Sequence, residues 1–247
     1  MPRANRVFCG GRVWHITHRC HRRSFLLKFV RDRRRWRHWL FEARRRYGLS
    51  VLNYMCTSNH VHILCADQGN GEISQSMQLV SGRTAQEFNA RKSRNGAFWE
   101  DRYHATAVQT DGHLARCIAY IDLNMVRAGA VQHPRDWEVS GYNEIQIPWQ
   151  RKGVIDFRLL MKMLSVDTHQ ELTKLQDRLL VGDSDSTRRN PLWTESLAVG
   201  DETYLEEIRT VLGVRGLRRQ ISSEQGIRCL REPICPYLPF SEPKLRY

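Results

Sequence analysis

The sequence predicts an α+β fold in which helices pack on one face of an antiparallel sheet, and two patterns carry this prediction. Short segments rich in β-branched and aromatic residues alternate polar and apolar positions, as strands do, at residues 12–21, 49–56, 60–66 and 97–108. Longer segments with apolar residues three or four positions apart, as in amphipathic helices, lie between and after them. With 247 residues and 41% hydrophobic content, the chain is long enough to bury a core.

The helical segments are expected at residues 29–47, 73–91 and 111–128. Gly48 follows the first of them, where a helix C-terminal cap is expected. The resulting order, strand–helix–strand–strand–helix–strand–helix, predicts a ferredoxin-like antiparallel sheet with helices on one face. In such a fold the helix at 111–128 is able to lie across the sheet and bring its side chains to the strand at 60–66.

The charge of the chain is uneven. Its formal net charge is +13, and residues 1–150 carry 23 Lys and Arg against 12 Asp and Glu, a net charge of +11. This excess predicts a polyanionic partner such as a nucleic acid, although a solubilising basic surface is the alternative. No apolar run approaches membrane-spanning length, so no membrane partner is expected. The seven cysteines are scattered, which favours reduced thiols in a cytoplasm.

The helix at 29–47 is the most basic segment. Eight arginines lie between Arg31 and Arg46, opposed only by Asp32 and Glu42, and tryptophans are interleaved with them. This composition predicts phosphate contact and base stacking, whereas a solvated charged face is the alternative. Over this helix and the other basic and aromatic segments, the side chains expected to contact DNA are Arg33, Arg34, Arg37, Arg83, Arg102, Tyr103, His104 and Arg127.

The strand at 60–66 carries the most informative pair of side chains. Because side chains alternate along a strand, His60 and His62 project from the same face. Two neighbouring imidazoles can share a divalent metal when a third ligand arrives from elsewhere, although a half-buried strand edge is the commoner meaning of this pattern. No zinc site is expected at the other histidine-rich stretch, because its spacing fits none and His15 and His18 face opposite sides of their strand.

A third ligand is available about sixty residues later. Tyr120 and Asn124 are four positions apart in the helix at 111–128, so they lie one turn apart on one face. Two histidines and an amide oxygen form a three-ligand site with open positions, suited to Mg²⁺ or Mn²⁺ bound to a phosphate oxygen. A tyrosine beside that metal is a plausible nucleophile toward a phosphodiester.

Four sequence blocks, in this order and spacing, resemble the single-tyrosine HUH transposases, and within them the REP-associated tyrosine transposases (RAYTs). The blocks cover about residues 7–145 and consist of Trp14-His15-Ile16-Thr17, Ser58-Asn59-His60-Val61-His62-Ile63-Leu64, Phe98-Trp99-Glu100-Asp101-Arg102-Tyr103-His104 and Tyr120-Ile121-Asp122-Leu123-Asn124-Met125-Val126-Arg127-Ala128-Gly129. Ser58 and Met125 stand where many members of the family have proline. Neither is an expected ligand.

The resemblance implies a metal-dependent DNA strand transferase. In that family His60, His62 and Asn124 would hold Mg²⁺ or Mn²⁺, and Tyr120 would be the catalytic nucleophile. The expected substrate is single-stranded DNA with imperfect, REP-like hairpins, cut and rejoined through a covalent 5′-phosphotyrosine. A domesticated protein that binds hairpin DNA or RNA without cutting is the alternative. A regulatory partner protein is disfavoured by the charge.

The expected domains are a catalytic domain at 1–147 and a mainly helical extension at 148–247. The extension has helical spacing over 150–181, a polar linker at 182–191, short helices at 193–198 and 201–212, and a proline-containing tail from Pro233. It is expected to grip the hairpin or cover the catalytic face, with a purely stabilising role as the alternative. A bacterial, cytoplasmic and nucleoid-associated monomer or homodimer is expected.

Overall fold

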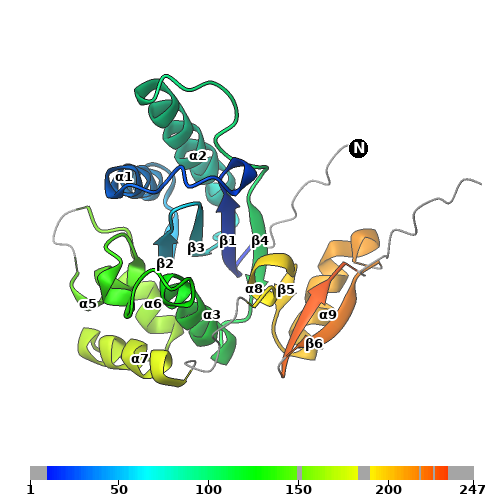
Figure 1. Cartoon of the computed structure of the whole chain (residues 1–247). Helices are drawn as coiled ribbons and strands as arrows, with labels where there is room; N and C mark the ends of the chain where they lie inside the picture. The colour runs from blue at the N-terminus through cyan, green and yellow to red at the C-terminus, as the bar shows by residue number, and fades with distance from the viewer. Residues whose placement is uncertain (1–9, 149–151, 183–189, 217, 225, 233–247) are drawn as a thin grey trace, which may run out of the picture.

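The computed structural model describes residues 10–148, 152–182, 190–216, 218–224 and 226–232. Within these residues the chain forms one seven-stranded sheet with the strand order β2-β3-β1-β4-β5-β7-β6 (Figure 1). The strands are β1 (Val13–Arg19), β2 (Ser50–Cys56), β3 (His60–Ala66), β4 (His104–Val108), β5 (Ala198–Val199), β6 (Gln220–Glu224) and β7 (Ile227–Arg231).

Helices surround this sheet. The α-helices are α1 (Val30–Tyr47), α2 (Glu72–Arg91), α3 (Gly112–Asp122), α4 (Asn124–Arg127), α5 (Gly141–Gln146), α6 (Phe157–Met163), α7 (His169–Gly182), α8 (Leu192–Glu195) and α9 (Glu202–Leu212). Short 3-10 helices are η1 (His21–Arg23), η2 (Pro134–Asp136) and η3 (Gly213–Arg215). The α1 helix ends as predicted, because Gly48 has a left-handed φ of 70° and donates its N–H to the carbonyl of Arg44.

The register of the sheet decides which side chains share a face. Directly paired residues of antiparallel strands project from the same side, and β1 pairs Arg19 with His60 and Thr17 with both His62 and His104. The three histidines therefore lie on one face. The adjacent pair Ile16 and Ile63 projects from the other face, into the core that α1 and α2 cover (Figure 1).

The α+β class is confirmed, with a mixed sheet in place of a purely antiparallel one. Every described neighbouring pair is antiparallel except β4 and β5, which are parallel. The helices α1 and α2 lie on one face, and α3 lies on the opposite face, which bears His62, so helices cover both faces of the sheet and not one as predicted. The expected boundary at residue 147 does not divide the sheet, because strands from both sides of it are neighbours at β4 and β5.

The C-terminal extension contains the expected helices α6, α7 and α9, and three strands that the sequence did not predict. The first of these, β5, is two residues long and follows the one-turn helix α8, so no period could reveal it. The strand β6 is mostly polar, which hides it among loop residues. The proline-containing tail and most of the polar linker lie outside the described residues.

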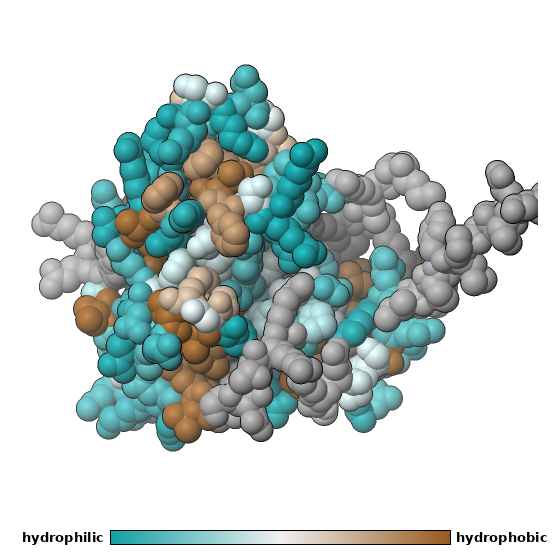
Figure 2. All heavy atoms as spheres, viewed as in Figure 1, coloured by the Kyte–Doolittle hydropathy of each residue, from teal (hydrophilic) through white to brown (hydrophobic). Residues whose placement is uncertain are grey.

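The surface is predominantly polar. Figure 2 shows hydrophilic side chains over most of the face it presents, with apolar residues in smaller groups among them, as is usual for globular domains. Within the described residues, no helix has the length and apolar character that crossing a membrane requires. The described cysteines, at positions 20, 56, 65, 117 and 229, are buried free thiols.

Candidate active site

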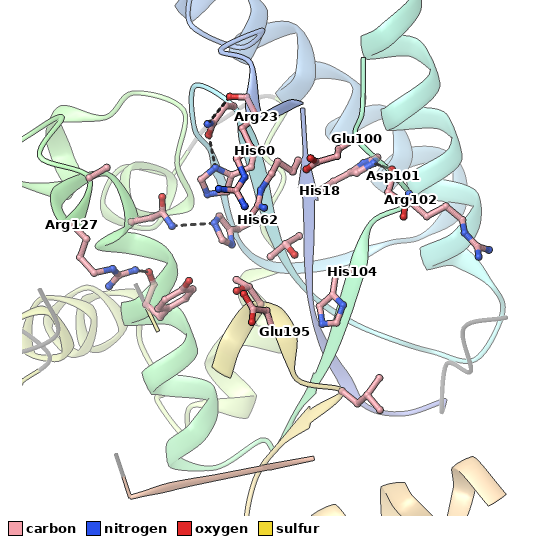
Figure 3. A pocket seen from close by; sticks show the side chains of 18 of the residues that line it. His18, Arg23, His60, His62, Glu100, Asp101, Arg102, His104, Arg127 and Glu195 are labelled. Carbon is pink, nitrogen blue, oxygen red and sulfur yellow. Dashed lines mark hydrogen bonds between the residues drawn. The ribbon is translucent and has the colours of Figure 1, made fainter. Parts of the chain in front are cut away.

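A cavity of about 860 Å³ lies where β1, β3 and β4 meet the junction of α3 and α4 and the short helix α8. Figure 3 shows His60, His62 and Glu195 around this space. Its lining is dominated by histidines, arginines and carboxylates. Among the lining residues are Arg19, Arg23, His60, His62, Glu100, Asp101, Arg102, His104, Tyr120, Asn124, Arg127, Thr194, Glu195 and Arg231.

His60 and His62 lie side by side as the strand alternation predicts, with their ring centroids 4.8 Å apart. The ring of His60 is held by its own turn, since Nδ1 lies 2.7 Å from Oδ1 of Asn59 and 2.9 Å from Oγ1 of Thr57. An amide oxygen accepts only, so Nδ1 of His60 carries the proton. Nε2 of His60 is therefore the nitrogen whose lone pair is suited to metal binding.

His62 is 1% exposed, and its ring orientation depends on His15. Nδ1 of His62 lies 2.9 Å from Nε2 of His15, whose Nδ1 lies 2.9 Å from the backbone oxygen of Trp193. Complete burial lowers the pKa of His15 to about 3, against the opposing effect of its hydrogen bond to Trp193. His15 is therefore neutral near pH 7 and donates its single proton to the Trp193 carbonyl.

Asn124 lies on the other side of His62, with Nδ2 at 3.1 Å from Nε2 of His62 (Figure 3). An amide donor at this distance is matched by a lone pair on Nε2, in agreement with a proton on Nδ1 of His62. Asn124 follows a break in the predicted helix: α3 ends at Asp122, Leu123 has a ψ near 0°, and α4 begins at Asn124.

Tyr120 is 4% exposed and packs among aromatic and cationic groups. The guanidinium carbon of Arg127 lies 4.4 Å from its ring centroid, and the ring of Trp193 lies 6.1 Å away. The ring of His62 meets it edge-on, also with a centroid distance of 6.1 Å. The structure thus brings together Tyr120, His60, His62 and Asn124, the four residues that the sequence singled out.

The end of α3, between Tyr120 and Asn124, is anchored by a buried carboxyl group. Asn53 on β2 donates to Oδ1 of Asp122 at 3.0 Å, and Gln176 on α7 donates to Oδ2 at 2.8 Å. Desolvation raises the pKa of Asp122 to about 7, although both hydrogen bonds act in the opposite direction. This network connects the core strand and the C-terminal extension to the helix that carries the proposed nucleophile.

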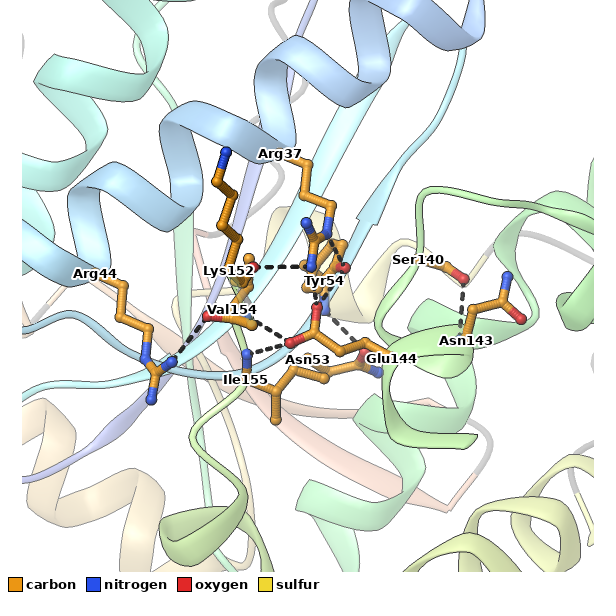
Figure 4. A network of polar contacts seen from close by, with 11 residues as sticks. Arg37, Arg44, Asn53, Tyr54, Ser140, Asn143, Glu144, Lys152, Val154 and Ile155 are labelled. Atoms are coloured by element: carbon orange, nitrogen blue, oxygen red, sulfur yellow. Dashed lines mark hydrogen bonds and ion pairs between the residues drawn. The ribbon is translucent and has the colours of Figure 1, made fainter. Parts of the chain in front are cut away.

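Two of the arginines expected to contact DNA, Arg33 and Arg37, are buried in the fold. Arg33 donates to the carbonyls of Leu27 and Lys28. Arg37 pairs with the buried Glu144 at 2.8 Å and donates to the hydroxyl of Tyr54 (Figure 4). Both guanidinium groups therefore donate to acceptors within the protein.

The other expected DNA contacts divide by position. Arg34 is exposed and forms a two-pronged pair with Glu138, and the exposed Arg83 lies over the ring of Trp39. Tyr103 packs near the ring of His18, which lies on the opposite face of the sheet from His62. The remaining three line the cavity: Arg102, His104 and Arg127. Arginines therefore reach the cavity from several elements, including α4 and the loop before β4, whereas much of the charge on α1 is paired.

Sequence reasoning missed three residues of the site. His15 was set aside as a zinc ligand, and its role beside His62 requires the pairing of β1 with β3. Trp193 and Glu195 come from α8 in the C-terminal extension, which no local pattern connects to the cavity. The usable signal was the position of His15 within the first of the four resembling blocks.

The donor set fits a divalent cation. Among the described residues no cluster of three His, Cys, Asp or Glu side chains exists, and the amide of Asn124 is the further donor group beside the two histidines. Two imidazole nitrogens and an amide oxygen, with positions left for phosphate oxygens, suit Mg²⁺ or Mn²⁺. Turning the Asn124 amide over would direct its oxygen to where its nitrogen now lies beside His62.

Comparison with known proteins finds a similarity over the region that builds this site. Residues 12–124, just under half of the chain, match the family model described as "Transposase IS200 like". This region is therefore similar to the IS200-like transposases. The match spans β1 through the first residue of α4, so it includes every one of the four residues gathered at the cavity. Metal dependence is general in the IS200-like family.

Two solved structures are similar to the chain that carries the IS200-like region. A REP-associated tyrosine transposase bound to a REP hairpin is 20% identical, with 64% of this chain and 95% of that chain covered and a TM-score of 0.49. A candidate transposase from Deinococcus radiodurans R1 is 15% identical, with 48% and 95% covered and a TM-score of 0.35. None of the curated proteins matches the chain.

Proposed function

We propose that this protein is an IS200-like transposase that cuts and rejoins single-stranded DNA beside hairpins, with Tyr120 as nucleophile. The observation that carries the proposal is the convergence of Tyr120, His60, His62 and Asn124 on one cavity that arginines also line. A protein that only binds DNA has no need of a metal-binding donor set beside a buried tyrosine. We place the chain in the RAYT subgroup on its four sequence blocks.

The proposed reaction conserves the phosphodiester bond energy. The hydroxyl oxygen of Tyr120 attacks the scissile phosphorus. A bond forms between the tyrosine oxygen and the phosphorus, which stays on the 5′ end of one DNA segment, and the bond from the phosphorus to the 3′ oxygen of the other segment breaks. The proton of Tyr120 leaves to solvent or to a cavity base, and the departing 3′ oxygen takes up a proton. Attack by a 3′-hydroxyl on the phosphotyrosine reverses the step and rejoins two strands.

The residues around the cavity have distinct parts in this reaction. His60, His62 and Asn124 would hold the cation, which when bound polarises the scissile phosphate and offsets the charge that builds on it. Arg127 lies over the ring of Tyr120 and lines the cavity, so it is placed to bind a phosphate beside the nucleophile. Arg102 and Arg23 extend the positive lining toward the surface.

The proposed setting follows from the same features. The partner is DNA, with no membrane component, and the location is the bacterial nucleoid in the cytoplasm. Because Tyr120 lies beside His62 of its own chain, one copy contains the complete donor set and nucleophile, which suits a monomer acting in cis. The catalytic domain at 1–147 is proposed to use α8 of the extension as part of its site.

A labelled single-stranded oligonucleotide tests the proposal. The full chain is incubated with Mn²⁺ and a series of labelled oligonucleotides, each of which carries a hairpin from repeats flanking the gene. The products are then separated on a denaturing gel. A protein-linked label that requires metal and is lost in Tyr120→Phe is expected. Hairpin binding with no covalent product, over several substrates and both metals, would replace the proposal with the non-cutting binder.

A further inference from the structure

The His62 ring is connected by hydrogen bonds to a distant part of the chain. Nε2 of His15 lies 2.9 Å from Nδ1 of His62, and Nδ1 of His15 lies 2.9 Å from the carbonyl oxygen of Trp193. The two rings are nearly coplanar, with an interplanar angle of 11°. The segment that supplies the carbonyl belongs to the C-terminal extension, outside the 12–124 family match.

The Trp193 carbonyl, at one end of this series of hydrogen bonds, decides which ring nitrogens carry the protons. A backbone carbonyl only accepts, so His15 places its proton on Nδ1 and presents the lone pair of Nε2 to His62. His62 must then donate from Nδ1, and its own lone pair faces Asn124 at Nε2. With the opposite tautomer of His62, two lone pairs would face each other and the proton would occupy the position that a metal requires.

The segment that supplies the Trp193 carbonyl is itself held in place. Thr106 lies two residues after His104 on β4, so both side chains project from the same face. The hydroxyl of Thr106 lies 2.7 Å from the backbone oxygen of Ser196 and 3.3 Å from that of Trp193. Nε2 of His104 lies 2.9 Å from the same Ser196 oxygen. The strand β5, which begins two residues later, pairs with β4. These contacts fix the 193–196 segment against the sheet.

We propose that His15 is a positioning residue for the metal ligand His62, and that the 193–196 segment of the C-terminal extension completes the metal site through it. This inference rests on the proposed function, since it concerns how the ring of His62 is oriented to bind the cation of the same site. Outer partners of ligating histidines fix the tautomer and ring orientation, and their loss weakens metal binding by about 10- to 100-fold. The extension is thereby a part of the catalytic centre.

Three variants of the full chain test this relay, the series of hydrogen bonds from His62 through His15 to the Trp193 carbonyl. His15→Phe keeps the ring volume and removes both hydrogen bonds, whereas His15→Gln retains an oxygen that accepts from His62 and an N–H that donates to the carbonyl. His169→Phe is the matched control, because His169 is a half-buried histidine whose Nε2 also bonds a backbone carbonyl, that of Ile145 at 2.7 Å, and it lies outside the cavity lining. Two readouts are used: long-range ¹H–¹⁵N spectra of the imidazoles in metal-free protein, and Mn²⁺ affinity by calorimetry.

The expected results differ among the variants. His15→Phe loses the Nδ1–H signature of His62 and binds Mn²⁺ about 10- to 100-fold more weakly, while His15→Gln and His169→Phe stay within about threefold of the parent. An unchanged His62 tautomer and an unchanged Mn²⁺ affinity in His15→Phe would overturn the relay. Absence of Mn²⁺ binding in the parent would count against the proposed function, and the metal-free spectra would still decide the relay.

A separate surface carries a second inference. The loop between β1 and α1 exposes two phenylalanines, Phe25 at 66% and Phe29 at 58%. Lys92 lies with its Nζ 5.6 Å from the ring centroid of Phe29, and Lys28 beside it is exposed. An exposed apolar patch rimmed by polar or charged residues is a feature of interaction sites. Their composition fits a single-stranded nucleic acid, whose bases stack and whose phosphates are anionic.

The same loop begins at the cavity. Arg22 and Arg23 have left-handed φ values of 52° and 56°, a conformation that residues other than glycine adopt at a cost. The carbonyl of Arg23 accepts from the side chain of Asn59, the residue before His60, and Arg23 lines the cavity. The strained pair therefore turns the chain outward from the metal-binding strand toward Phe25.

We infer that Phe25 and Phe29 form a base-stacking surface for the single strand that runs out of the cavity over Arg23. The inference relies on the DNA substrate of the proposed function. Stacking of a base on an aromatic ring contributes about 1–3 kcal/mol by alanine substitution and tolerates any base. The surface would therefore strengthen binding of the strand and leave recognition of its sequence to other residues.

Fluorescence anisotropy with a labelled twelve-nucleotide oligothymidylate tests this surface in the full chain. The double variant Phe25→Ala/Phe29→Ala is expected to bind about tenfold more weakly or worse, and Phe25→Leu/Phe29→Leu to show a similar loss because leucine has no π-face. Ile147→Ala, which removes an exposed apolar side chain elsewhere, is the control. Equal affinity of the parent and both double variants would overturn the surface. A parent that does not bind the oligonucleotide would instead contradict the proposed function.

Discussion

The guanidinium carbon of Arg127 lies 4.4 Å from the centre of the Tyr120 ring, and Arg127 also donates a hydrogen bond to the backbone carbonyl of Tyr120. One cation thus holds both the ring and the backbone of the proposed nucleophile. Arg127 faces the cavity as well, so a phosphate bound there would share this cation with the tyrosine. Arg127 is thus placed between the cavity and the proposed nucleophile.

Replacing Arg127 with methionine tests whether this side chain bridges the substrate and the nucleophile. Arg127→Met keeps much of the side-chain length and removes the charge, so we expect the rate of covalent product formation to fall at least about tenfold. Oligonucleotide affinity should fall less, because one phosphate contact among several is lost. Single-turnover cleavage and anisotropy measure the two effects separately. Arg34→Met, at an exposed pair with Glu138 away from the cavity, is the matched control. A larger loss of affinity than of rate would contradict the bridge.

The sequence predicted the parts of the site that obey a local period. The strand alternation placed His60 beside His62, and the helical spacing placed Tyr120 and Asn124 on one face. The three main helices and the first strands also follow from such periods. The turn after α1 was recoverable because Gly48 is the residue that a left-handed cap requires.

The remainder depended on contacts that no local pattern encodes. The arginines of α1 look alike in the sequence, yet Arg37 turns inward because Glu144, in a different helix, is buried opposite it. The role of His15 required the pairing of β1 with β3 and a carbonyl from residue 193. Composition gives the positive net charge of the chain, and ion pairs between distant segments decide which of the described arginines have a carboxylate partner within the protein.

The buried pair of Arg37 and Glu144 leads to a prediction about stability. Removing one member of a buried ion pair leaves the other charged and desolvated, so Arg37→Ala should lower the free energy of unfolding by about 3–5 kcal/mol. Urea denaturation followed by circular dichroism measures this loss. Oligonucleotide affinity of the folded fraction should stay within about twofold, because a side chain 7% exposed contacts no DNA. A stable variant with weakened DNA binding would restore Arg37 to the DNA interface.

The pKa of Asp122, raised to about 7 by burial, predicts a pH dependence of stability. The unfolded carboxyl ionises near 3.8, so between pH 3.8 and about 7 the folded chain retains a proton that the unfolded chain has lost. The contribution of this group to stability is therefore complete below pH 3.8 and is lost as the pH rises to about 7, at about 1.4 kcal/mol per pH unit.

The Asp122→Asn variant isolates this contribution. Its neutral amide cannot titrate, so the difference in unfolding free energy between parent and variant should shift with pH across this window, the parent losing stability relative to the variant as the pH rises. Urea denaturation of both chains at pH 5 and pH 7.5 gives the comparison. A difference that does not change between the two pH values would mean that Asp122 is ionised throughout and held by Asn53 and Gln176 alone.

The arginines that line the cavity predict how DNA binding responds to salt. Each phosphate contact releases counterions, so the logarithm of the affinity should fall linearly with the logarithm of the salt concentration, with a slope of about −0.7 per contact for single strands. Arg102 is exposed at the cavity rim, so Arg102→Ala should reduce the magnitude of this slope by about 0.7. Arg35→Ala is the matched control, because Arg35 on α1 is paired with Glu87 on α2 and lies outside the cavity lining. Anisotropy titrations between 50 and 300 mM KCl, roughly the range in which counterion release dominates, give both slopes. If Arg35→Ala reduced the slope and Arg102→Ala did not, the DNA path would run along α1, as the arginine-rich segment first predicted, and the cavity lining would have to serve the metal site alone.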